Sequence, residues 1–174
     1  MLRGLLDRLV LLAGTIAGGC VPGFIQQYRQ RVGGRLDQVQ IDLAPFQQIA
    51  TRFHDGDMQA LVRHHLASSD PSFHAEGQAL QDMLDSLTRL QAMAEGLSGS
   101  LWQQIAYLLR HYDRDIGAAT WSDHVPVFSV EPAGLVVAFT IGLTLWLLFL
   151  LLWQGGRWMI GTLATRSAPV ARRR

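Results

Sequence analysis

The stretch PAGLVVAFTIGLTLWLLFLLLWQGG, residues 132–156, decides the fold because none of its 25 residues is charged. Eight leucines, two valines, one isoleucine and two phenylalanines favour insertion of a helix into lipid by about 4–8 kcal/mol. As a helix the segment is roughly 36 Å long, which exceeds the ~30 Å hydrocarbon layer of a bilayer. We therefore predict a transmembrane helix over residues 132–156.

A second charge-free run extends from Leu9 to Tyr28. Glycines and Pro22 interrupt its apolar residues, so the same arithmetic gives only about 2–5 kcal/mol in favour of insertion. This run predicts a first transmembrane helix over residues 9–28.

Small residues recur at four-residue spacing in both predicted spans. Such spacing gives a smooth helix face that allows two helix backbones to approach closely in lipid. We expect the two faces to pack together, through Gly14, Gly18, Gly19 and Gly23 in the first span and Gly134, Ala138 and Gly142 in the second.

The N-terminus also allows a different interpretation. Residues 17–20, Ala-Gly-Gly-Cys, resemble a bacterial lipoprotein cleavage site, at which the first 19 residues would be removed and Cys20 lipidated. Asp7 in the leader and apolar sequence that continues to Ile25 favour a retained span instead. An intact Met1 in mass spectrometry would distinguish the two. Cys20 is the only cysteine, so no internal disulfide is possible.

The distribution of arginine sets the expected orientation. All 15 basic residues are arginines; eight lie between the two runs beside 13 acidic residues, and five follow residue 156. The positive-inside rule then places both termini in the cytoplasm and the middle segment outside it, in the inner membrane of a bacterium. The absence of lysine favours a GC-rich bacterial genome. The arginines form no stripe with aromatic residues, so we expect no nucleic-acid partner.

The middle segment predicts helices only. Apolar residues at spacings of three and four run from Phe24 to Phe53, which is typical of an amphipathic helix with a coiled-coil-like seam. Asp57 and Asp70 are predicted helix N-caps, and nothing alternates with period two. We expect an all-α chain in which two transmembrane helices bracket a small extracytoplasmic helical bundle. Its expected parts are a cytoplasmic N-terminus (1–8), the first span (9–28), the helical domain (29–116), an extended linker (117–131), the second span (132–156) and a basic cytoplasmic tail (157–174).

Candidate chemistry is sparse. Four histidines lie between residues 54 and 74 near several carboxylates, a composition that zinc or copper sites use, but no pair has helical i, i+4 spacing. Residues 54–57, His-Asp-Gly-Asp, read as a turn because the later ligands of a calcium loop are missing. We expect no catalytic residue, no metal, no cofactor and no enzymatic activity.

The run from Gly23 to Asp37, GFIQQYRQRVGGRLD, resembles the opening signature of an uncharacterised, domain-of-unknown-function family of short bacterial two-span inner-membrane proteins. The resemblance continues through Asp70-Pro71 and Glu76-Gly77 to Glu131. It implies only the architecture of two spans around a helical domain.

These patterns favour a non-enzymatic integral membrane protein whose extracytoplasmic helices mediate protein–protein or self-association. Its partners would be the lipid bilayer and either further copies of the chain or another membrane protein. Two alternatives stay open: an accessory subunit of a transporter or channel, and a periplasmic ligand or metal sensor that uses the histidines of residues 54–74.

Overall fold

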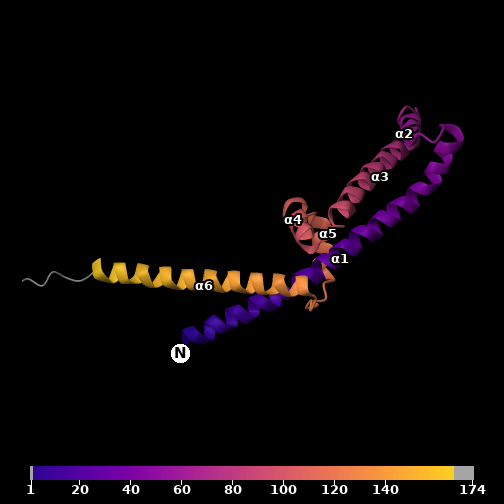
Figure 1. Cartoon of the computed structure of the whole chain (residues 1–174). Coiled ribbons are helices and arrows are strands. Elements are labelled where there is room, and N and C mark those ends of the chain that lie inside the picture. Colours follow the sequence, from indigo (N-terminus) through magenta and orange to yellow (C-terminus); the bar gives the residue numbers. More distant parts are fainter. Residues whose placement is uncertain (1, 167–174) are drawn as a thin grey trace, which may run out of the picture. The chain divides into compact units, whose positions relative to one another are not determined.

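A computed structural model describes the backbone of residues 2–166 and the side chains of residues 3–155. Within this part every regular element is a helix, so the predicted all-α class is confirmed. The helices are α1 (Leu2–Phe53), α2 (Met58–Leu66), α3 (Pro71–Gly96), α4 (Leu101–His111), α5 (Arg114–Ser122) and α6 (Pro132–Arg166) (Figure 1). They form two compact units, Met1–Phe24 with Val125–Arg174 (unit 1) and Ile25–His124 (unit 2).

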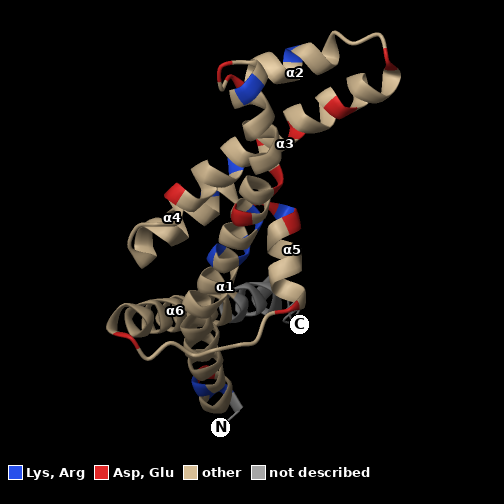
Figure 2. Cartoon of the chain, turned by 90° about the vertical axis from the view of Figure 1, so that its right-hand side faces the viewer, with Lys and Arg blue, Asp and Glu red and all other residues tan. Residues whose placement is uncertain are grey.

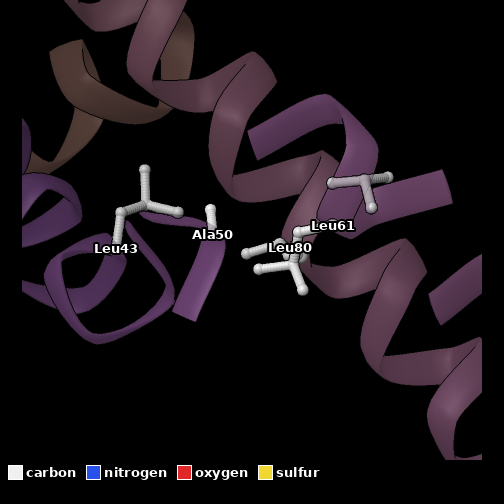
Figure 3. Packing of buried hydrophobic residues seen from close by; sticks show 5 residues of the cluster. Leu43, Ala50, Leu61 and Leu80 are labelled. Atoms are coloured by element: carbon white, nitrogen blue, oxygen red, sulfur yellow. The ribbon is translucent and has the colours of Figure 1, made fainter. Parts of the chain in front are cut away.

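The core of unit 2 lies where α1, α2 and α3 meet. Leu43 and Ala50 on α1 pack with Leu61 on α2 and Leu80 on α3 (Figure 3). These residues are nearly or fully buried, and half-buried methionines, leucines and Phe46 surround them. The later part of the predicted seam of α1, from Val39 to Ala50, thus faces this core, while Phe53, its last residue, is exposed.

The turns of unit 2 follow local backbone chemistry. Gly56 adopts a φ of +84°, which glycine tolerates best, and its N–H donates to the Ala50 carbonyl 3.0 Å away, which ends α1. The predicted N-caps are confirmed, because the Asp57 carboxylate accepts from the Gln59 N–H and the Asp70 carboxylate accepts from the Ser72 N–H, both at 2.8 Å.

Helix α1 extends well past the predicted first span. It runs unbroken for 52 residues, through Gly33, Gly34 and Pro45. Pro45 lacks the N–H that would bond the Ile41 carbonyl, but both residues are exposed, so water can satisfy that carbonyl. No helix end therefore marks the predicted boundary at residue 28.

The linker expected over residues 117–131 starts later than expected, because residues 117–122 are helical and belong to α5. The Asp113 carboxylate accepts 3.0 Å bonds from the N–H groups of Asp115 and Ile116 and so starts this helix. Ile116 and Thr120 are then buried one turn apart. Of the expected linker, residues 123–131 lie outside the helices.

Two helices of the described part are long and apolar enough to cross a membrane: α1, within Arg3–Phe53, and α6, over Pro132–Gly155. Figure 2 shows the coloured charges on the helices of unit 2 and none on α6 within residues 132–155. The span limits 9–28 and 132–156 stay predictions. The side chains of the basic tail, residues 157–174, lie outside the described part.

We expect the Leu80→Ala variant to lower the free energy of unfolding by about 2–5 kcal/mol, because it opens a cavity at a fully buried site. Leu109→Ala is the matched control, since Leu109 is 83% exposed and its truncation should change stability by less than about 0.5 kcal/mol. Denaturant titration of the full chain in detergent micelles, followed by circular dichroism, measures both. Equal effects of the two variants would contradict this core.

Candidate association surfaces

Within unit 1, glycines let α1 and α6 approach backbone to backbone. A Cβ built on Gly14 would lie 3.1 Å from the Cα of Gly142. A Cβ on Gly18 would lie 3.0 Å from the Cα of Ala138 and 2.9 Å from the Cβ of Ile141. Because residues 14 and 18 meet residues 142 and 138, the two helices run antiparallel here.

The other small residues predicted for span packing have different neighbours. Gly19 lies under the ring of Phe128, and a Cβ on Gly23 would lie 3.0 Å from the carbonyl oxygen of Val127. Both are therefore covered by the segment before α6. Gly134 lies against Ser129 of that same segment, whereas Gly142 also meets Thr15 of α1.

One polar pair joins the two helices further along. The indole Nε1–H of Trp146 on α6 donates to the Asp7 carboxylate on α1. Spacing alone did not reveal this pair. The signal in the sequence is Asp7, a carboxylate two residues before the charge-free run that begins at Leu9. A carboxylate in apolar surroundings needs a hydrogen-bond donor.

Unit 2 exposes large apolar side chains along the last part of α1. Ile41 is 65% exposed and Phe53 68%, and the exposed Pro45 and Ile49 lie between them. These four residues recur every four positions, so they follow one another along the helix surface. We call Ile41, Pro45, Ile49 and Phe53 the α1 stripe. The four stripe residues carry no charge, and the exposed Arg52 lies beside them, three residues after Ile49. Exposed apolar side chains of this kind are a surface that proteins use to associate.

Polar contacts join the two ends of α5 to α1 and α3 within unit 2. The Asp113 N–H donates to the Tyr28 hydroxyl at 3.2 Å, and the Asp113 carboxylate pairs with Arg89 at 3.1 Å. Arg31 donates to Asp123 at 2.6 Å. This hydrogen bond is the main reason that the pKa of the Asp123 carboxyl lies below its usual value.

The histidines form a loose group rather than a metal site. The rings of His54 and His64 lie 5.4 Å apart between centroids, and the Nδ1 of His65 is 3.6 Å from a Glu76 oxygen, too far for a hydrogen bond. In the part of the chain with described side chains, no three His, Cys, Asp or Glu residues are grouped to hold a metal ion.

A shallow depression of about 350 Å³ lies between α3 and α4. Tyr107, His111 and Tyr112 supply its aromatic lining, and Arg89, which also lines it, is paired with Asp113. A guanidinium that already has a carboxylate partner is a poor anchor for an anionic ligand. This depression therefore offers weaker support for a function than the α1 stripe.

A family described as "Protein of unknown function (DUF2937)" matches residues 2–162, and the chain belongs to this family. The match confirms the resemblance to an uncharacterised family. No curated protein and no solved structure matches the chain.

We expect Gly18→Ile to lower the free energy of unfolding by about 1–3 kcal/mol, because its side chain would push Ala138 and Ile141 away from α1. Gly4→Ile is the matched control in the same helix, since nothing lies within 4 Å of a Cβ at Gly4. Unfolding by sodium dodecyl sulfate in mixed micelles measures both. A control as harmful as Gly18→Ile would show that this helix contact is not the cause.

The bond from Arg31 to Asp123 predicts a defined pH dependence. A carboxyl whose folded-state pKa is lowered adds stability that is full above its unfolded pKa of about 3.9 and is lost as the pH falls through the folded pKa. Asp123→Asn should therefore lower the Tm at pH 7 but not near pH 2.

Melting curves of wild type, Asp123→Asn, Arg31→Gln and the double variant test this bond. The two single variants should lower the Tm by the same amount at pH 7, and the double variant should add nothing further. Additive losses would show that the two residues act separately.

Proposed function

We propose that this family member is a non-enzymatic integral protein of the bacterial inner membrane. Helices α1 and α6 anchor it, both termini lie in the cytoplasm, and unit 2 lies outside the cytoplasm. Two helices of spanning length and the arginines after residue 156 support this placement. In this placement unit 2 acts by binding a second copy of the chain.

The α1 stripe is the observation that carries this proposal. Ile41, Pro45 and Ile49 are exposed along a helix that already uses Leu43 and Ala50 for the core of unit 2. Contact with another apolar surface would remove the stripe from water, at roughly 25 cal/mol for each Å² buried.

Membrane anchoring favours a second copy as the partner. Copies with the same orientation in one bilayer present the same face at the same height, so a twofold axis along the membrane normal brings two α1 stripes together. Such an isologous contact needs no charge complementarity, and the four stripe residues carry no charge.

The two alternatives have less support. An accessory subunit that lines a larger assembly with its glycines would need those glycines uncovered. Gly14 and Gly18 instead contact α6. Gly19 is covered by Phe128, and Gly23 by Val127. A metal sensor would need a ligand set that the described residues do not bring together.

Cysteine crosslinking in native membranes tests self-association. In a Cys20→Ser background, Ile41→Cys should give a dimer on oxidation, whereas Leu109→Cys on α4, which is even more exposed, should stay monomeric. Adding Ile49→Asp should weaken dimerisation about tenfold, because it places a charge in the contact, at a cost of ~1.4 kcal/mol.

A monomer at residue 41, together with no co-purified protein after mild detergent extraction, would overturn the association proposal. A monomer that instead co-purifies with a different membrane protein would overturn self-association and favour the accessory-subunit alternative.

A further inference from the structure

The segment that leads into α6 is unusual for a chain in water. Residues 124–130 have no regular structure and no charge, and the segment is bounded by Asp123 and Glu131. Val125, Val127 and Phe128 are exposed, and Val130 is 78% exposed. Four large apolar side chains in seven residues are exposed together, and such a surface is typical of contact with another protein or with a membrane.

Contacts within unit 1 fix where this segment lies along α1. The Ser129 N–H donates to the Gly19 carbonyl oxygen at 2.9 Å, and the Phe128 ring covers Gly19. Val127 lies one helical turn away, beside Gly23. Both glycines belong to the charge-free run that predicts the first span, so the segment lies beside apolar helix rather than beside its charged continuation.

The antiparallel register shows how far the segment extends. Gly18 is level with Ala138, which lies six residues, or about 9 Å, beyond Pro132 at the start of α6. Ser129 and Phe128 meet the neighbouring Gly19. Residues 128 and 129 therefore lie about level with residue 137, alongside the first turns of α6. From there the chain turns back to Glu131 and starts α6 at Pro132.

We propose that residues 125–130 form a membrane-inserted loop whose exposed valines and Phe128 contact lipid acyl chains. This inference rests on the proposed placement of α1 and α6 in a bilayer. Continuity with α6 supports lipid as the partner. The loop before Glu131 and the start of α6 after it are both uncharged, and both lie against the charge-free part of α1 that we place in the bilayer.

Two features of the loop backbone lower the cost of such a site. Irregular backbone at membrane depth is tolerated where protein satisfies its polar groups. Pro126 has no N–H to satisfy, and the Ser129 N–H is bonded to α1. Gly19 and Gly23 let the loop lie directly on the helix, since a Cβ at either position would press against Phe128 or Val127.

Nitroxide labels on single cysteines in liposome-reconstituted full chain test the loop. In a Cys20→Ser background, Val130→Cys is compared with Leu148→Cys on α6 and Leu109→Cys on α4, and Val127→Cys serves as a second loop site. Collisions with a water-soluble nickel chelate should be roughly fivefold or more rarer at residues 127 and 130 than at 109, because hydrocarbon excludes a polar chelate. Collisions with oxygen, which concentrates in lipid, should be frequent at both loop sites.

Each outcome has a separate meaning. Frequent nickel collisions at residue 148 would overturn the membrane placement itself. Protection at residue 148 with frequent nickel collisions at both loop sites would leave that placement intact and overturn the inserted loop. Protection of the loop sites from both nickel and oxygen would overturn lipid contact in favour of a second copy that covers the loop.

Discussion

The structure of unit 1 depends on backbone contact between α1 and α6, which three missing side chains make possible. Gly14 faces Gly142, and Gly18 faces Ala138, and a Cβ at either glycine of α1 would crowd the backbone of α6. In lipid, apolar side chains gain little by leaving the solvent, so close packing and hydrogen bonds must hold two helices together.

That register has consequences for the chain on either side. It leaves Gly19 and Gly23 level with the first turns of α6 but on a neighbouring face of α1, and the incoming segment covers them there. The same glycines that allow a helix contact at positions 14 and 18 therefore allow a loop contact at positions 19 and 23. A single run of small residues thus serves two different neighbours.

The sequence predicted those features that depend on local chemistry. The N-caps Asp57 and Asp70, the turn at Gly56 and the apolar seam of α1 each follow from residues close together in the chain. Helix α5 was missed because its nine residues show little periodicity and its start depends on Asp113, which also bonds Arg89 from a distant helix. The glycine spacing identified a smooth face, but spacing carries no information about which segment covers each glycine.

The Asp7–Trp146 bond shows how unequal apolar lengths are accommodated. Helix α6 is free of charge through Gly155, whereas α1 carries Asp7 and Arg8 only seven and six residues before Gly14. Counting the same distance along α6 from Gly142 leads to Leu148 and Phe149, so these charges lie beside strongly apolar helix. An arginine can extend its long side chain toward the headgroups, but an aspartate cannot. A donor on the facing helix is then the remaining way to satisfy the carboxylate, and the indole N–H of Trp146 supplies it.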